Sequence, residues 1–372
     1  MKRILFIIGT RPEAIKCAPL IKALELHKKF NPIVVLTSQH QHMLTPIINF
    51  FKLKIDKVIN LNRTSDSLSE LTIKLLPELE KVIIDSNPDY ILVQGDTSSA
   101  FLGALSGFYQ KRPIIHLEAG LRSFNKYLPF PEEINRKLIS NLADIHFVPT
   151  EKNKEILATE NIQEHVFKVG NTVIDALLNG LKIIQKCPDQ FENYFQNKQI
   201  NINQKSILIT LHRRETIGKE LIEACEAILE LSKQYPKIQW IFPVHLNPKI
   251  NEPVKEILEN QENIKLLPPL DYPYFIYLLS KSFLILTDSG GIQEEAPSIN
   301  VPVLILRDVT ERNEILETGA GKLIGTNKKK VIMEISSLID DAKAYKKMLN
   351  TQNPYGDGKA SQKIIKLFET FL

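Results

Sequence analysis

The sequence Phe283-Leu-Ile-Leu-Thr287 continues directly as Asp288-Ser-Gly-Gly-Ile-Gln-Glu-Glu-Ala296. An apolar run of strand length ends in a polar turn with two glycines, and the residues after the turn favour a helix. This order predicts a buried parallel strand that leads into a helix with exposed backbone N–H groups at its first turn. Those groups suit an anion, and Glu295 in the same helix suits a ribose diol. An ordinary helix with Ser289 as its N-cap explains the same residues equally well.

Similar apolar runs alternate with helical stretches along the chain, in two series that are separated by a polar stretch from Lys186 to Lys205. The runs of the first series are Ile4–Ile8, Ile33–Leu36, Tyr90–Val93, Ile114–His116, Asp144–Val148 and Val166–Lys168. Those of the second are Ile207–Thr210, Ile238–Pro243, Ile264–Leu267, Phe283–Leu286 and Val303–Leu306. Short apolar strands that alternate with helices predict parallel sheets covered on both faces. Two such series predict two doubly wound α/β domains.

Length, charge and cysteine content narrow the class of protein. A chain of 372 residues is too long for one ordinary core, which favours two domains. The net charge of +4 is spread without a dominant basic block, so we expect no nucleic-acid partner. Three widely spaced cysteines indicate neither a disulfide framework nor a metal site. The first apolar run is too short for a signal peptide and no run approaches a membrane span, so we expect a cytoplasmic protein without a membrane partner.

Polar residues collect where the predicted strands end, and ligands of doubly wound sheets bind at that edge. The segments are Gly9-Thr-Arg-Pro-Glu13 with Lys16, Gln94-Gly-Asp-Thr97, His116-Leu-Glu-Ala-Gly-Leu-Arg122, Pro131-Glu-Glu-Ile-Asn-Arg136 and His212-Arg-Arg-Glu215. Each has a structural explanation as well: Asp96 suits a helix cap, and Glu118 with Arg122 suits a local ion pair. Taken together, three carboxylates, a histidine and several arginines predict acid–base chemistry on a phosphorylated ligand.

Further motifs follow in order along the chain: Gly170-Asn-Thr-Val-Ile-Asp175, Pro243-Val-His-Leu-Asn-Pro248, Asp288 to Pro297, Thr310-Glu-Arg312 and Asn353-Pro-Tyr-Gly-Asp-Gly358. With the segments above they are spread in order across nearly the whole chain. Together these segments resemble the non-hydrolysing UDP-N-acetylglucosamine 2-epimerases. The resemblance implies a GT-B fold, in which two Rossmann-like doubly wound domains have a cleft between them. Residues 1–170 would form the N-terminal domain and residues 171–356 the nucleotide-binding domain. The last helix, residues 357–372, would return to the first domain.

The resemblance also implies an isomerase, a homodimer that interconverts UDP-GlcNAc and UDP-ManNAc without NAD or another cofactor. Such an enzyme supplies ManNAc units for cell-envelope polysaccharides. C2 of the sugar has no adjacent carbonyl, so its proton becomes removable only as UDP leaves C1. The product is a 2-acetamidoglucal, and protonation of its other face followed by return of UDP inverts C2. This route needs a firm diphosphate site and more than one acid–base group.

Residue roles follow from the resemblance. Asp96, Glu118 and Glu132 match the acid–base carboxylates, and His212 matches a catalytic residue beside the diphosphate and the glycosidic oxygen. The expected substrate-binding residues are Arg11, Lys16, Arg136, Ser289, Gly290, Gly291, Glu295 and Arg312. Among them Ser289, Gly290 and Gly291 would hold the diphosphate, Glu295 the ribose, and Arg11 and Arg312 would lie in the nucleotide site. Arg136, one helical turn after Glu132, is expected to orient Glu132 or to contact substrate. We expect no metal ligand.

Two segments depart from the family pattern. Leu270 stands where some relatives carry a glutamine that contacts the nucleotide base. Gln39-His-Gln-His-Met43 is similar to a segment with which some members bind a second UDP-GlcNAc as an activator, although Leu61 to Asp66 aligns poorly; allosteric activation is therefore a hypothesis. The alternatives at this point are a GT-B glycosyltransferase, a hydrolysing epimerase that releases ManNAc, an epimerase of a modified UDP-HexNAc, and a non-catalytic nucleotide-sugar sensor.

Overall fold

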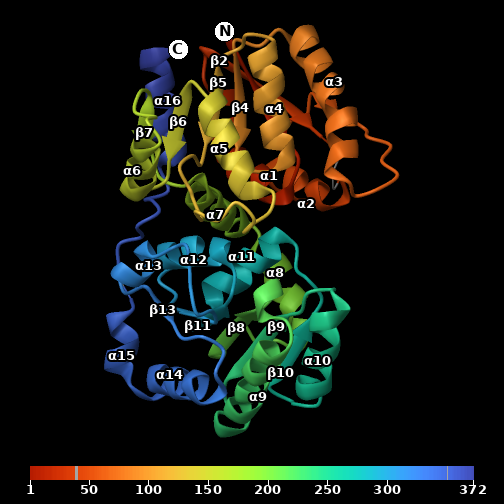
Figure 1. The fold of residues 1–372 in the computed structure, drawn as a ribbon. Coiled ribbons are helices and arrows are strands. Elements are labelled where there is room, and N and C mark those ends of the chain that lie inside the picture. The colour runs from red at the N-terminus through yellow and green to blue at the C-terminus, as the bar shows by residue number, and fades with distance from the viewer. Residues whose placement is uncertain (38–40, 350) are drawn as a thin grey trace. The chain divides into compact units, whose positions relative to one another are not determined.

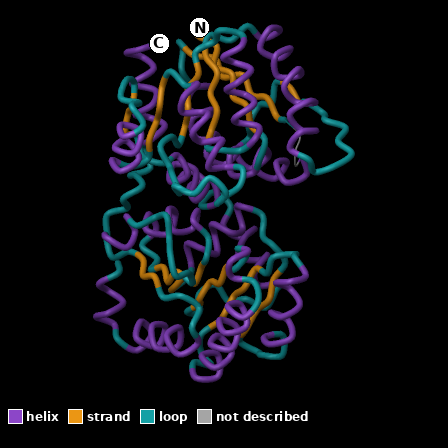
Figure 2. Tube along the Cα trace, in the orientation of Figure 1, coloured by secondary structure: helices purple, strands orange, loops and turns teal. Residues whose placement is uncertain are grey.

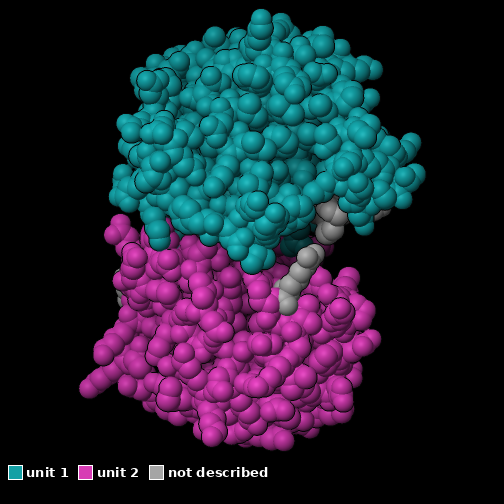
Figure 3. Space-filling model, in the orientation of Figure 1, with its two compact units in different colours: residues 1–179, 355–372 teal, residues 180–354 magenta. Residues whose placement is uncertain are grey.

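The computed structural model describes residues 1–37, 41–349 and 351–372 (Figure 1). The chain forms two compact units: unit 1 contains residues 1–179 and 355–372, and unit 2 contains residues 180–354 (Figure 3). The segment 39–43, from which allosteric activation was hypothesised, lies partly outside the described residues, and the side chains of residues 41–43 are not described.

Unit 1 contains a seven-stranded parallel sheet with the order β3-β2-β1-β4-β5-β6-β7 (Figure 2). Its strands are β1 (Lys2–Ile8), β2 (Phe30–Leu36), β3 (Lys57–Val58), β4 (Tyr90–Gln94), β5 (Ile114–Leu117), β6 (Ile145–Val148) and β7 (Val166–Lys168). Its helices are α1 (Arg11–Glu25), α2 (Gln41–Phe51), α3 (Leu68–Ser86), α4 (Ser98–Tyr109), α5 (Glu132–Leu142), α6 (Glu151–Thr159), α7 (Thr172–Ile184), which continues into unit 2, and α16 (Ala360–Phe371).

The apolar strand residues explain why this sheet is covered on both faces. Leu5 and Ile7 of β1 are buried in one core cluster with residues of α3 and α4. The neighbours of Leu5 and Ile7 in the strand, Ile4 and Phe6, are buried as well, as expected for a parallel strand that has helices on both sides. The terminal helix α16 packs beside α1, and its Phe368 contacts the ring of Phe30 at the start of β2.

Unit 2 contains a six-stranded parallel sheet with the order β10-β9-β8-β11-β12-β13. Its strands are β8 (Ser206–Thr210), β9 (Gln239–Pro243), β10 (Ile264–Leu267), β11 (Leu284–Thr287), β12 (Val303–Ile305) and β13 (Gly321–Leu323). Its helices are α8 (Pro188–Gln196), α9 (Lys219–Gln234), α10 (Pro248–Leu258), α11 (Tyr272–Lys281), α12 (Gly290–Glu295), α13 (Glu314–Glu317), α14 (Lys328–Asp340) and α15 (Ala342–Lys347), with short 3-10 turns η1 (Arg214–Thr216) and η2 (Ala296–Ile299).

These two sheets confirm the predicted pair of Rossmann-like domains. The polar stretch from Lys186 to Lys205, which separates the two series of strands in the sequence, contains the helix α8. Phe191 and Phe195, one helical turn apart, bury one face of this helix. Their aromatic rings pack against Tyr277 of α11, which holds α8 to unit 2.

Each sheet has one point at which the strand order reverses direction, between β1 and β4 in unit 1 and between β8 and β11 in unit 2. In unit 1 the register pairs Ile7 with Val93, so the residues after β1 and β4 emerge at one edge of the sheet. In unit 2 Thr210 pairs with Thr287, and their hydroxyl oxygens lie 2.6 Å apart. Such switch points are the usual ligand-binding edge of doubly wound sheets.

Candidate active site

Glu13 joins the two turns at the switch point of unit 1. It is buried in the first turn of α1, where its carboxylate accepts hydrogen bonds from the backbone N–H groups of Gly9 and Thr10 at 2.7 and 2.6 Å. It also accepts a hydrogen bond from the Thr97 hydroxyl in the turn after β4. Burial raises the pKa of Glu13 to about 7, and the hydrogen bonds oppose this shift. Glu13 therefore fixes the turn that carries Arg11, a half-buried residue at the start of α1, against the turn that carries Asp96.

Glu118 follows β5, and both its side chain and its backbone have a defined arrangement. Its Oε1 accepts a hydrogen bond from Lys16 Nζ at 2.7 Å, and its Oε2 accepts one from Gln94 Nε2 at 2.8 Å. Glu118 has a φ of +66°, a left-handed conformation that residues other than glycine rarely adopt. Strained conformations of this kind concentrate at functional sites. The expected local pair between Glu118 and Arg122 is absent: Arg122 is buried and forms a two-pronged ion pair with Glu160.

Asp96 is paired with Arg136. Arg136 Nε donates to Asp96 Oδ2 at 2.7 Å, and its Nη1 donates to Glu133 Oε2 at 3.1 Å. Glu133 is fully buried and accepts hydrogen bonds from the backbone of Ser123 and Phe124, so it anchors this arginine to the loop 118–131. Arg136 was expected either to orient Glu132 or to contact substrate, and these two ion pairs are with Asp96 and Glu133 instead of Glu132. They place Arg136 against Asp96.

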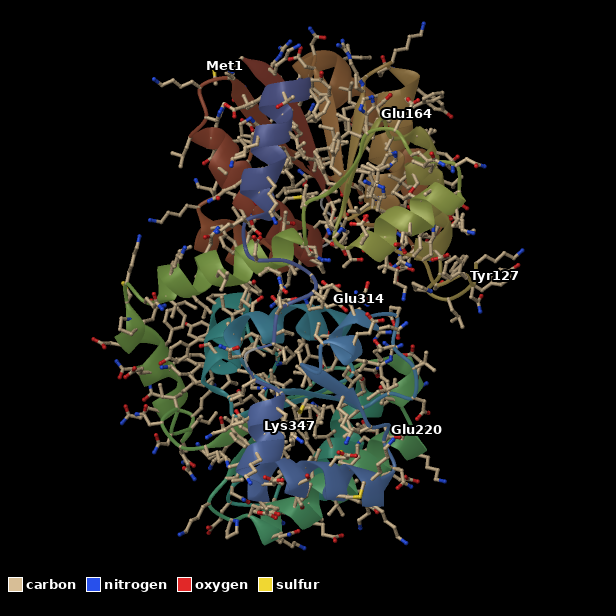
Figure 4. All side chains as sticks on the ribbon, turned by 90° about the vertical axis from the view of Figure 1, so that its left-hand side faces the viewer. Met1, Tyr127, Glu164, Glu220, Glu314 and Lys347 are labelled. Carbon is tan, nitrogen blue, oxygen red and sulfur yellow. The ribbon has the colours of Figure 1, made fainter. Side chains whose placement is uncertain are left out.

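Glu132 is the first residue of α5. It is partly buried, and no hydrogen-bond donor to its buried Oε2 atom is recorded among the described residues. The loop that precedes α5 carries exposed apolar side chains, and Tyr127 extends outward from unit 1 (Figure 4). The carboxylate of Glu132 therefore lies beside a solvent-facing loop, whereas those of Asp96 and Glu118 are each held by a cation.

Asp288 connects the two turns at the switch point of unit 2 through its hydrogen bonds. It is fully buried, and its Oδ2 accepts hydrogen bonds from the backbone N–H groups of His212 and Arg213, both at 2.9 Å, and from the Thr216 hydroxyl at 2.6 Å. Its Oδ1 lies 3.2 Å from His212 Nδ1. Burial lowers the pKa of His212, and the negative charge of Asp288 opposes this shift. The turn after β8 is thereby built around the first residue of the turn after β11.

The two glycines of the turn Asp288 to Gly291 have different surroundings. A Cβ atom on Gly290 would lie 2.5 Å from the Arg312 guanidinium, whereas a Cβ on Gly291 would meet no atom within 4 Å. Gly290 therefore allows a cation to lie against the backbone at the start of α12. Ser289 is the N-cap residue of α12 and is partly exposed, although its side chain makes no capping hydrogen bond.

Arginines gather beside this turn and are held by Glu311. Arg213 Nη2 and Arg312 Nη1 donate to Glu311 Oε1 at 3.1 and 2.9 Å, and Arg307 Nη1 donates to Oε2 at 2.9 Å. Burial raises the pKa of Glu311, but the three arginines outweigh this effect and hold it at about 2. Arg312 Nε also donates to Glu294 Oε1 at 2.8 Å.

Glu295, the expected ribose contact, is buried in α12. Its Oε1 accepts a hydrogen bond from the Tyr272 hydroxyl of α11 at 3.3 Å. Within unit 2 the structure therefore brings together His212, Ser289, Gly290, Gly291 and Arg312 at the edge of the sheet, with Glu295 in the helix that follows. Within unit 1 it brings together Lys16 with Glu118, and Arg136 with Asp96.

Sequence reasoning did not assign a role to four residues that organise these groups: Gln94, Glu133, Asp288 and Glu311. All four stood inside the quoted motifs, but each has at least one partner outside its own motif. Among the described residues no cluster of His, Cys, Asp and Glu side chains is arranged to hold a metal ion. In the same part of the chain no helix combines the length and the apolarity that crossing a bilayer requires.

Fold and site together define a two-domain α/β enzyme. One switch point has two carboxylates that are each paired with a cation, and the other has a turn lined by arginines. The sequence profile of the family described as UDP-N-acetylglucosamine 2-epimerase matches residues 22–369. The chain belongs to this family, whose members are isomerases.

Known relatives agree with this assignment. A UDP-N-acetylglucosamine 2-epimerase of Campylobacter jejuni is 46% identical over 99% of this chain and 97% of its own length. The crystal structure of UDP-GlcNAc 2-epimerase from Neisseria meningitidis bound to UDP-GlcNAc has a TM-score of 0.92 at 44% identity and covers 99% of this chain and 100% of the other. The structure of S. aureus MnaA with UDP has a TM-score of 0.88 at 45% identity, and the match covers 100% of this chain and 98% of the other. A glycosyltransferase of kitacinnamycin, 10% identical over 99% of this chain and 98% of its own, has a TM-score of 0.65 and shares the fold alone.

Proposed function

We propose that this protein is a non-hydrolysing UDP-GlcNAc 2-epimerase, which interconverts UDP-GlcNAc and UDP-ManNAc. The observation that carries the proposal is the full-length match, with a TM-score of 0.92, to a relative whose crystal structure contains UDP-GlcNAc. The two switch points support the proposal. The switch point of unit 1 has residue types suited to acid–base chemistry, and that of unit 2 has residue types suited to binding a nucleotide.

Unit 1 supplies the acid–base groups in this proposal. Inversion at C2 requires removal of a proton from one face of the sugar and delivery to the other, so more than one acid–base group is needed. Asp96, Glu118 and Glu132 are the candidates. Arg136 holds Asp96 at 2.7 Å and Lys16 holds Glu118 at 2.7 Å, so that two of the three carboxylates have fixed positions. In this proposal Arg136 and Lys16 also contact the substrate.

Unit 2 supplies the site for the nucleotide. The diphosphate binds at Ser289, Gly290 and Gly291, where Arg312 lies against the backbone and the open space beside Gly291 admits a phosphate. Glu295 accepts hydrogen bonds from the ribose hydroxyl groups. As the bond from C1 to the diphosphate breaks, negative charge grows on the departing oxygen. Arg312 and His212 stabilise that charge, which lowers the barrier to both departure and return.

The protein is further proposed to act as a cytoplasmic homodimer that supplies ManNAc units for cell-envelope polysaccharides. Exposed apolar residues support a protein–protein interface on unit 1: Ile73 and Ile84 on α3 are 73% and 63% exposed, and Phe108 and Tyr109 on the neighbouring α4 are 57% and 53% exposed. Light scattering coupled to gel filtration tests the dimer. A mass near twice 42.5 kDa is expected, and a monomer at micromolar concentration would contradict it.

Product analysis tests the proposed reaction. Purified protein incubated with UDP-GlcNAc alone should form UDP-ManNAc until the two nucleotide sugars reach equilibrium, as resolved by anion-exchange chromatography. The Asp96→Asn variant should lose turnover and keep its affinity for UDP. Release of free ManNAc with stoichiometric UDP would instead indicate a hydrolysing enzyme, and turnover that requires an acceptor would indicate a glycosyltransferase.

A further inference from the structure

The buried carboxylate of Asp288 forms a pair with the partly exposed imidazole of His212. Asp288 is fully buried, and the described residues offer its Oδ1 no conventional hydrogen bond. His212 Nδ1 lies 3.2 Å from this atom. A buried carboxylate oxygen without a donor is costly, so the pair is stable when Nδ1 carries a proton that points at Oδ1.

The second oxygen of Asp288 fixes the geometry of the pair. Three donors meet at Oδ2: the N–H groups of His212 and Arg213 and the hydroxyl of Thr216. With three hydrogen bonds on one oxygen, the carboxylate has one orientation and Oδ1 faces the imidazole. Since the backbone of His212 is itself among these donors, Asp288 sets both the position of the residue and the direction of its ring.

The far edge of the imidazole is accessible. The His212 side chain is 44% exposed although its partner is fully buried. A proton on Nδ1 therefore leaves Nε2 as the atom that meets a ligand. Nε2 of a neutral ring accepts a proton there, and Nε2 of the imidazolium donates a hydrogen bond.

We propose that Asp288 is a positioning residue that holds His212 with a proton on Nδ1, so that Nε2 donates to the departing diphosphate oxygen and takes the proton back. This inference rests on the proposed function. The negative charge of Asp288 stabilises the imidazolium, in the way that a carboxylate behind a catalytic histidine fixes its tautomer and supports its charge. Other charged or titratable neighbours of the ring are Arg213 and His245, which disfavour the imidazolium, and Glu215, which favours it.

The Asp288→Asn variant separates positioning from folding. Its amide oxygen keeps the three hydrogen bonds, and its NH₂ group then faces Nδ1, which favours the opposite tautomer of the ring. The matched control is Thr216→Val, which removes one of the three hydrogen bonds and leaves the carboxylate facing His212.

The first measurement is ¹⁵N and ¹³C NMR of His212 in the full-length protein without substrate. The neutral wild-type ring should carry its proton on Nδ1, and the Asp288→Asn ring on Nε2. The His212 pKa should fall by about one unit or more in the variant, because a carboxylate this close favours the charged ring. A wild-type ring protonated on Nε2, or an unchanged pKa in the variant, would overturn the proposal.

The second measurement is the pH profile of epimerisation. In Asp288→Asn, kcat should fall about 10- to 100-fold, in line with the loss of other groups that orient a functional histidine. Affinity for UDP by calorimetry should change little, and the high-pH limb that reports His212 should move to lower pH. Thr216→Val should keep kcat within about threefold, as expected for a neighbour that leaves the charge pair intact. An equal loss of kcat in both variants would reduce Asp288 to a structural role. Absence of epimerisation in the wild type would overturn the proposed function instead, and the tautomer would still be measurable.

Discussion

Lys16 Nζ donates to Glu118 Oε1 at 2.7 Å, from one turn inside α1 to the residue that follows β5. Glu118 holds this position with a φ of +66°, a conformation that costs on the order of 1 kcal/mol or more for a residue with a side chain. Such a backbone conformation does not stabilise the protein. We therefore infer that it is retained because the function requires the Glu118 carboxylate at this position.

Replacement of Lys16 by methionine should therefore impair catalysis. Lys16→Met removes the cation but keeps much of the buried side chain, and kcat/KM for UDP-GlcNAc should fall about 100-fold, as for other charged groups placed at a reacting centre. Lys22→Met is the matched control on the same helix, because Lys22 forms an exposed ion pair with Glu25. Steady-state kinetics within threefold of the wild type for Lys16→Met would contradict the role given to this pair.

Gly290 and Gly291, which we propose to bind the diphosphate, should respond differently to replacement by alanine. In Gly290→Ala the new Cβ would lie 2.5 Å from the Arg312 guanidinium and must displace it, so UDP should bind about tenfold more weakly or worse, the loss expected for one charged hydrogen-bonding partner. Thermal unfolding and calorimetry with UDP measure both effects. Gly291→Ala should unfold at the wild-type temperature, because its Cβ meets open space. Unchanged UDP affinity in Gly290→Ala would show that Arg312 does not serve the nucleotide.

Glu311 should matter for binding because it gathers Arg213, Arg307 and Arg312. In Glu311→Gln these guanidinium groups lose their shared anion and repel one another, so KM for UDP-GlcNAc should rise about tenfold while kcat changes less. Glu215→Gln is the control, since Glu215 is largely exposed and lies 3.6 Å from Arg213. Equal kinetic effects of the two variants would indicate a general charge effect.

Glu13 should make the stability of the protein depend on pH. Its folded pKa is raised from 4.5 to about 7, so between these values the unfolded chain releases the proton while the folded chain keeps it. The folded state is therefore destabilised as the pH rises through this window, by up to about 3 kcal/mol. The glutamine side chain in Glu13→Gln does not titrate. The free energy of unfolding of this variant, measured in urea, should therefore increase relative to that of the wild type from pH 5 to pH 8. A difference that stays constant with pH would contradict the raised pKa.

Local sequence pattern was sufficient for much of the fold. The apolar runs Val166–Lys168 and Ile264–Leu267 were predicted as strands and have the same bounds as β7 and β10, because the signals for strands and turns are local. The helix α8 was missed, since Phe191 and Phe195 stand among Asn and Gln residues that favour a loop. Two buried aromatic rings outweighed the propensity of their neighbours.

The partners of the site residues depend on long-range pairing that a local pattern does not contain. His212 and Asp288 are 76 positions apart and meet because β8 lies beside β11. Arg136 was expected to orient Glu132, its neighbour four positions earlier, or to contact substrate. Its guanidinium instead contacts Asp96, which β4 places beside α5 from 40 positions away. Residue types at strand ends were thus predictable, whereas their ion pairs required the order of the strands.

In the proposed reaction UDP leaves C1 while a proton leaves C2, and NMR of UDP-GlcNAc turnover in heavy water tests this elimination. We expect deuterium to appear at C2 of both UDP-GlcNAc and UDP-ManNAc without accumulation of UDP or free ManNAc, and we expect Asp96→Asn to abolish the exchange. Formation of UDP-ManNAc with an unlabelled C2, or no change in the nucleotide sugar without an added acceptor, would contradict it.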